Sequence, residues 1–145
     1  MLTRCWTRTA CPVTEYERGV LDTSVVIDLP LIDADTLPGE LAISSITLAE
    51  LAAGPHANCD ANERALRQAR LQWAEATFDP LPFDAEAARS YGRIYAAVRS
   101  AGRQPRKRVS DLFTASIAAG NGLPLLTRNP DDFAGLGDLV DLVSV

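Results

Sequence analysis

The chain has 145 residues, of which 47% are hydrophobic and 23% charged, and its 14 basic and 19 acidic side chains give a formal net charge of −5. This length and apolar content fit one domain with a single core. No apolar run reaches the roughly 18 residues of a membrane span, and the net charge excludes a uniformly basic coat for nucleic acid. Three cysteines without a CxxC pair and a single histidine argue against a disulfide framework or a zinc site, which is typical of a cytoplasmic protein.

The N-terminal segment differs from the rest of the chain. Residues 1–19 carry charges and threonines without an apolar signal-peptide region and without helical or strand periodicity. We therefore expect a poorly structured leader over 1–19 and one domain over 20–145.

The first expected elements are a strand and a short helix. Residues 19–22 form an apolar run that ends in an acid, which predicts a buried strand. Thr23 or Ser24 is expected to cap a helix over 25–29. The next expected elements are a strand over 41–44 and a helix, opened by Ser45 or Thr47, that ends at 54–55.

Two longer helices follow, because apolar residues recur at helical spacing over 62–78 and over 84–101, where Asp84 is the expected cap. The proline-rich segment between them, 79–83, predicts an edge strand. The remaining expected elements are a helix that Ser110 or Asp111 opens and that ends at 120–122, a strand over 123–126, one turn over 131–136 and a final strand over 139–145.

Strands that alternate with helices predict an α/β sandwich with a mainly parallel sheet. Sites in such sheets form beyond the carboxyl ends of the strands. The sequence places oxygen-bearing side chains there, and no GxGxxG, GxxxxGK[ST] or GxSxG motif. These side chains are those of Asp22, Glu50, Asp111, Asn129 and Asp132.

Carboxylates that converge in one crevice repel each other, which raises their pKa values unless a cation neutralises them. A hard divalent ion such as Mg²⁺ suits such ligands and supports the hydrolysis of phosphodiesters. An acid at a helix start is also a common N-cap, so Asp111 taken alone fits a capping role equally well.

The positive charges are concentrated in one segment. Between Glu86 and Asp111 there are seven basic residues and no acid, whereas the rest of the chain has seven basic against 19 acidic residues. A polyanion could bind this strip and reach the acids beyond it, although a solvated face or a surface for an acidic partner would have the same composition. The seven residues are Arg89, Arg93, Arg99, Arg103, Arg106, Lys107 and Arg108.

Four segments carry a family resemblance. They are LDTSVVID at 21–28, ITLAELAAG at 46–54, SDLFTASIAA at 110–119 and LLTRNPDDF at 125–133. With these segments in this order, the chain resembles PIN-domain ribonucleases, and in particular the VapC-type toxins of toxin–antitoxin pairs. The resemblance implies a PIN-like three-layer sandwich whose mainly parallel sheet has roughly five strands and is flanked by helices.

The resemblance also implies an activity and partners. The expected activity is that of a Mg²⁺-dependent endoribonuclease, with Mn²⁺ able to substitute, that cuts tRNA or rRNA and slows growth. The expected partners are a cognate VapB-like antitoxin and a second copy of the chain in a homodimer, with no membrane.

The same resemblance assigns roles to the acids. Asp22 and Asp111 match direct metal ligands, and Glu50 matches a third acid that holds the water shell or orients the attacking water. Many relatives carry an aspartate where this chain has Asn129, so Asp132 is the expected fourth acid. The expected supporting residues are Thr23, Ser24, Thr127 and Asn129. The basic strip, and not the resemblance, gives the expected RNA-binding residues, which are Arg93, Arg99, Arg103, Arg106, Lys107 and Arg108.

Two alternatives remain at this point. Asp22 could serve as an aspartyl-phosphate nucleophile, but the only lysine, Lys107, lies in the basic strip rather than after a later strand. A non-catalytic α/β module could also dock RNA or an acidic partner through residues 89–108, with its acids only capping helices.

Overall fold

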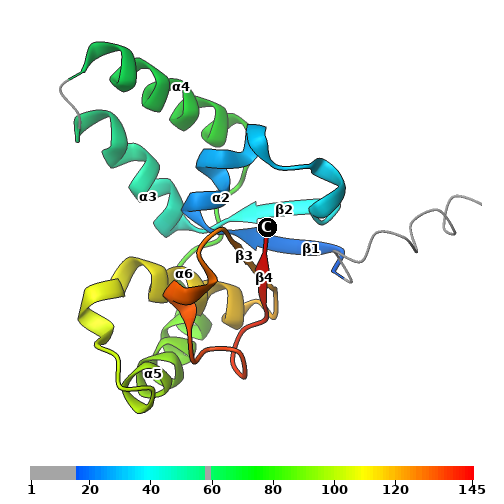
Figure 1. Ribbon diagram of the computed structural model, residues 1–145, viewed down its shortest axis with the longest axis vertical. Coiled ribbons are helices and arrows are strands. Elements are labelled where there is room, and N and C mark those ends of the chain that lie inside the picture. The colour runs from blue at the N-terminus through cyan, green and yellow to red at the C-terminus, as the bar shows by residue number, and fades with distance from the viewer. Residues whose placement is uncertain (1–15, 58–59) are drawn as a thin grey trace, which may run out of the picture.

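A parallel four-stranded sheet organises the residues that the computed structural model describes, 16–57 and 60–145 (Figure 1). The strand order is β2-β1-β3-β4. At the centre of the sheet, Leu21 is in register with Ile43 on one side and with Leu126 on the other. All carboxyl ends therefore lie at one edge. The strands are β1 (Arg18–Leu21), β2 (Glu40–Ile43), β3 (Leu125–Thr127) and β4 (Leu142–Ser144).

The expected fifth strand over 79–83 is wrong. The described part of this segment makes a single parallel bridge, between Leu81 and Ser44. Leu81 stands between Pro80 and Pro82, which have no N–H group to donate to a neighbouring strand. The pairing is therefore limited to this single bridge, and the sheet has four strands rather than five.

The helices lie on both sides of this sheet, with α3 and α4 together at one end of the molecule and α5 and α6 at the other (Figure 1). Their bounds agree with the expected helices to within a few residues. The helices are α2 (Thr23–Asp28), α3 (Ser45–Ala53), α4 (Ala61–Thr77), α5 (Ala85–Ser100) and α6 (Val109–Gly120). Two 3-10 segments matter for the site: η5 (Pro105–Arg108) directly precedes α6, and η6 (Pro130–Phe133) follows β3.

The helix starts correct one expectation and agree with two others. The cap of α2 is Asp22 and not Thr23 or Ser24, because the carboxylate that follows β1 accepts the Thr23 N–H. Helix α3 begins at Ser45, one of the two residues expected to open it, and its cap is Ser44. Asp84 caps α5, as predicted.

The start of α6 bears directly on the acids. This helix begins at Val109, ahead of Ser110 and Asp111, and no side chain caps it. Asp111 lies in its first turn without a capping hydrogen bond, so the capping role that the sequence left open for this residue is wrong.

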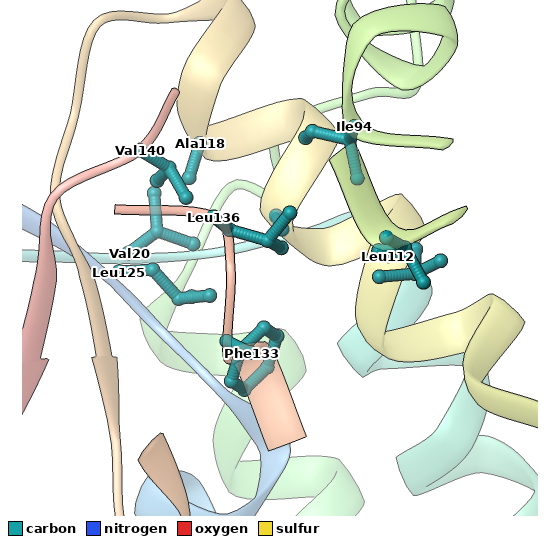
Figure 2. Packing of buried hydrophobic residues seen from close by; sticks show 10 residues of the cluster. Val20, Ile94, Leu112, Ala118, Leu125, Phe133, Leu136 and Val140 are labelled. Carbon is teal, nitrogen blue, oxygen red and sulfur yellow. The ribbon is translucent and has the colours of Figure 1, made fainter. Parts of the chain in front are cut away.

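The two faces of the sheet bury separate apolar clusters, because successive strand residues point to opposite sides. Val20 and Leu125 face α5 and α6 in the cluster drawn in Figure 2, while Leu21 and Leu126 face α2, α3 and α4. Each large side chain buried in this way contributes about 1.5–3 kcal/mol. The predicted three-layer α/β sandwich is confirmed.

The ends of the chain differ in part from expectation. Most of the predicted leader over 1–19 lies outside the described residues, and its last two residues already belong to β1. The expected turn over 131–136 corresponds to η6, and the expected strand over 139–145 is shortened to β4. None of the helices in the described ranges has the length and apolar character needed to cross a bilayer.

Candidate active site

Four acids from four separate segments lie near one another beyond the carboxyl ends of the strands. Asp22 follows β1, Glu50 lies in α3, Asp111 lies in the first turn of α6, and Asp132 lies in η6 after β3. Asp22 acts electrostatically on both Glu50 and Asp111, and Asp132 acts on Asp111. The structure thus brings together the four acids that the sequence singles out.

Asp22 is the most enclosed of the four, with 6% of its surface exposed. Its Oδ1 accepts the Thr23 backbone N–H at 2.9 Å. Its Oδ2 accepts the Ser24 hydroxyl at 3.0 Å and the Thr127 hydroxyl at 2.9 Å. Donors on three sides therefore fix this carboxylate in one orientation.

A chain of hydroxyl groups holds Glu50. Thr23 Oγ1 donates to Glu50 Oε1 at 3.0 Å and lies 3.1 Å from Thr47 Oγ1. Behind them, the buried Ser44 hydroxyl lies 3.4 Å from Thr47 Oγ1 and 3.3 Å from Thr114 Oγ1. The chain links α2, α3 and α6 through groups that satisfy one another, as buried polar groups must.

Ser44, Thr47 in its bonding role, and Thr114 are site residues that sequence reasoning missed. Each hydroxyl stands among apolar residues, at a strand end or inside a predicted helix. An uncharged polar residue in an otherwise apolar stretch is the signal that could have drawn attention to them.

The segment after β3 supports Asp22 from a second direction. Thr127 Oγ1, which donates to Asp22, accepts the backbone N–H of Asn129 at 3.0 Å. The backbone N–H of Arg128 donates to Ser24 Oγ at 3.3 Å. Asn129 therefore supports the site through its main chain.

Arg108 joins the other two acids. Its Nη1 lies 2.7 Å from Asp132 Oδ1 and 3.6 Å from Asp111 Oδ2. The side chain of Arg108 is 42% exposed, so this pair of contacts is partly screened by solvent. The basic strip therefore ends inside the acid cluster.

The acids repel one another, and two of them show the effect. Desolvation, followed by the charges of Asp22 and Asp132, raises the pKa of Asp111 above its ordinary 3.8, while Arg108 acts in the opposite direction. Glu50 is exposed as a whole residue, but partial desolvation of its carboxyl group raises its pKa above 4.5. The Thr23 hydrogen bond lowers that pKa, and the charges of Asp111 and Asp22 raise it.

This donor set fits a hard divalent cation, because it consists of carboxylate oxygens whose mutual repulsion a cation would relieve. Within residues 16–57 and 60–145, no three acidic, histidine or cysteine side chains are already close enough together to surround one ion. Asp22 is the fixed member of the set, and Asp111 is the member whose position and charge depend on Arg108.

The strip of basic residues does not stay together. Arg103, Lys107 and Arg108 reach a hollow that Asp132 also lines, whereas Arg93 donates to Ser90 within α5. Arg99 and Arg106 do not line this hollow. RNA binding by the strip stays a prediction.

The fold and the site define a class: a three-layer α/β domain with an acidic centre at the carboxyl edge of a parallel sheet. The chain belongs to the PIN-domain family, whose model matches residues 19–139. The sequence resemblance to this family is thereby confirmed.

Similar proteins narrow the position within the family to the VapC type. The chain is 40% identical over 121 residues to Ribonuclease VapC5 of Mycobacterium tuberculosis, with 81% of this chain and 87% of that protein covered. It is 31% identical over 131 residues to VapC ribonuclease Y4jK of Sinorhizobium fredii, with 81% and 91% covered.

Solved structures of other proteins have a similar fold. The fold is similar to that of VapBC-5 from Mycobacterium tuberculosis, a member of the VapBC family of toxin–antitoxin systems, with a TM-score of 0.78 and 36% identity over 90% of this chain and 98% of that one. It is also similar to FitAcB from Neisseria gonorrhoeae, with a TM-score of 0.67 and 26% identity over 86% and 95% of the two chains.

Proposed function

We propose that this chain is a metal-dependent endoribonuclease toxin of a toxin–antitoxin pair, which cleaves phosphodiester bonds in cellular RNA. The observation that carries the proposal is the convergence of Asp22, Glu50, Asp111 and Asp132, from four segments, on one edge of the sheet. The names of the similar proteins, which are VapC ribonucleases, support the same activity.

The four acids have different roles in this proposal. Asp22 and Asp111 would hold the metal ion, because Asp22 is fixed by three donors and its charge acts on Asp111. Glu50, which is held by Thr23, would orient the attacking water as an acceptor. Asp132 is the fourth acid, and Thr23, Ser24, Thr127 and Asn129 keep the carboxylates in place.

The proposed ion is Mg²⁺, with Mn²⁺ able to substitute, since both prefer oxygen ligands. When bound, it would favour ionisation of a water molecule and offset the negative charge that builds on the phosphate. The chain itself contributes the placement of the carboxylates and the positive charge of Arg108 beside them.

The proposed partners follow from the resemblance. They are a cognate VapB-like antitoxin, an RNA substrate of the tRNA or rRNA class and a second copy of the chain in a homodimer, all in the cytoplasm. A toxin–antitoxin assembly is the description of the similar VapBC-5 structure. Residues 20–145 are proposed as the nuclease domain together with the first two residues of β1, and the residues before β1 are proposed as the leader.

The non-catalytic alternative needs acids that only cap helices. Asp22 does cap α2, but Asp111 caps no helix, and burial and the charges of neighbouring acids raise its pKa. Repulsion between acids has no use in a binding module, whereas at a cation site the same negative charges attract the ion.

The test of the proposed function is RNA cleavage by the purified chain. Asp22→Asn and Asp111→Asn should each reduce cleavage more than 100-fold, because loss of a group behind a metal ligand already costs about 10–100-fold. EDTA should stop cleavage, and Mg²⁺ or Mn²⁺ should restore it in the wild type only. Mapping the new 5′ ends of cellular RNA after brief expression identifies the substrate. Unchanged cleavage in both variants would contradict the proposal.

A further inference from the structure

A hollow of about 340 Å³ lies next to the acid cluster. Its walls come from the end of α5, the loop after it, η5, the start of α6 and η6. This volume falls within the range of about 300–1,000 Å³ that is usual for small-ligand pockets. Asp132 and Arg108 belong both to this hollow and to the acid cluster, so a ligand here would adjoin the reacting groups.

The hollow is positively charged. Arg103, Lys107 and Arg108 line it against a single carboxylate, that of Asp132. Arg108 is paired with the carboxylates of Asp132 and Asp111. The guanidinium of Arg103 instead donates to a neutral group, the backbone carbonyl of Asp131, at 2.8 Å. Within the described ranges Lys107 has no carboxylate within 4.0 Å. Two cations thus remain available to an anionic ligand.

The hollow is also shaped before any ligand arrives. Gly102 adopts a positive φ of 76°, which turns the chain at the end of α5. The Arg103 backbone N–H then donates to Val98 at 3.1 Å, and its side chain ties this loop to η6. Buried Pro105 fixes the backbone at the start of η5. Such a preformed site saves the ordering cost of binding.

Among the remaining lining groups, the side chain of Gln104 suits a nucleotide. Val98 and Leu112 lie at the bottom of the hollow, where both are almost fully buried in the core. The amide of Gln104 offers both donors and acceptors, as the edge of a nucleobase requires. An inorganic anion would leave the Gln104 amide without a partner, and the adjoining acid cluster, which is proposed to act on phosphodiesters, favours a nucleotide over an acidic peptide.

We propose that this hollow binds one nucleotide of the RNA substrate beside the phosphate that is cut, with Arg103 and Lys107 on a phosphate and Gln104 on the base. The proposal rests on the proposed function and adds a source of sequence preference to it. Phosphate contacts position a nucleic acid, whereas contacts to the base select it. Gln104 is therefore a specificity-determining residue, and Lys107 is a binding residue.

The first test measures binding without catalysis. Each of the four ribonucleoside 5′-monophosphates is titrated into the full chain in EDTA and followed by NMR, with inorganic phosphate and a short polyglutamate peptide as comparison ligands. At least one nucleotide should bind more than about fivefold more tightly than phosphate, with the largest shifts at Gly102, Gln104 and Leu112. Gln104→Ala and Lys107→Ala should each weaken that binding about fivefold or more.

The controls are Gln72→Ala and Arg70→Ala, which change the same kinds of side chain on α4, a helix packed on the other face of the sheet. Both controls should bind nucleotide as the wild type does. Binding of phosphate as tightly as any nucleotide, or binding of polyglutamate alone, would overturn the proposal.

The second test uses the cleavage map. Gln104→Ala should cut RNA less efficiently and lose base preference at one position next to the cut, whereas Gln72→Ala keeps the wild-type rate and map. An unchanged map would overturn the role of Gln104 while Asp111-dependent cleavage still supports the proposed function. Conversely, a chain that binds nucleotides through Gln104 but cuts no RNA would contradict the proposed function and leave the nucleotide site in place.

Discussion

The two halves of the acid cluster are built differently. On one half, buried or half-buried hydroxyl and amide donors hold Asp22 and Glu50 through α2, α3 and β3. On the other half, one partly exposed cation, Arg108, lies between Asp111 and Asp132. The first half is fixed by neutral groups, and the second is adjusted by charge.

The difference teaches which half depends on folding and which depends on solution conditions. Buried hydroxyl donors keep their strength at any salt concentration, while contacts between partly exposed charges weaken as salt rises. We therefore expect the Asp22 half to contribute to stability. We expect the Asp111 half to cost stability in the absence of a cation, because burial and repulsion raise the pKa of Asp111.

The largest expected effect is a difference in the free energy of unfolding between variants of the two halves. Asp22→Ala removes the cap of α2 and leaves two hydroxyl donors without their acceptor, so the free energy of unfolding should fall by about 2–4 kcal/mol. Asp111→Ala should leave it unchanged or raise it, since no donor other than Arg108 is lost. Urea unfolding in EDTA measures both, and equal losses in the two variants would show that the halves are alike.

A smaller effect is expected from loss of the Thr127 hydroxyl, a donor in the half that neutral groups fix. Thr127→Val keeps the shape of the side chain but removes the donor to Asp22, which should cost about 1–3 kcal/mol and reduce RNA cleavage about 10–100-fold. The control is Ser116→Ala, which removes a buried hydroxyl that donates to the Leu112 carbonyl within α6. Ser116→Ala should leave cleavage near the wild-type rate. A full rate in Thr127→Val would show that this hydroxyl does not position Asp22.

The pH dependence tests the repulsion between acids, which acts across the two halves. In the folded chain the pKa values of Asp111 and Glu50 are raised above 3.8 and 4.5, so the folded state binds these protons more tightly than the unfolded state. The free energy of unfolding should therefore fall as pH rises through this region. In EDTA, the double variant Asp111→Asn, Glu50→Gln should be more stable than the wild type at pH 7, and the gain should vanish near pH 3.5. A gain that persists at low pH would mean that repulsion is not its cause.

The smallest expected effect concerns Arg108. Arg108→Gln removes a partly exposed pair of contacts, so stability should change by less than about 1 kcal/mol, while the pKa of Asp111 should rise further in an NMR titration. Arg18→Gln, which breaks a similar exposed pair with Glu40 at 2.8 Å, is the control that leaves Asp111 untouched. A loss of several kcal/mol would show that Arg108 is a rigid part of the fold.

The sequence alone predicts the elements whose signals are local. Short apolar runs predicted the strands, helical spacing predicted α4 and α5, and the four family-like segments predicted the acids. The hydroxyl chain through Ser44 and Thr114 could not be predicted, because its members are 70 residues apart and meet only when α6 packs against α3. The place of Arg108 between two acids likewise depends on how η5 and η6 approach each other.

The expected cap of α2 failed for a related reason. Asp22 directly follows β1 and caps α2, so the helix begins earlier than periodicity indicates. The fifth strand failed because two prolines limit pairing to Leu81.

The most direct measurement is calorimetric titration of Mn²⁺ into the chain near pH 4.5, the ordinary pKa of a glutamate carboxyl group, in two buffers of different ionisation enthalpy. If the four acids form one cation site, Mn²⁺ should bind with release of protons, because the raised pKa values of Asp111 and Glu50 must fall when the ion arrives. Asp111→Asn should abolish or strongly weaken that binding, and Ser116→Ala should not. Binding of Mn²⁺ to Asp111→Asn with wild-type affinity and proton release would contradict the account.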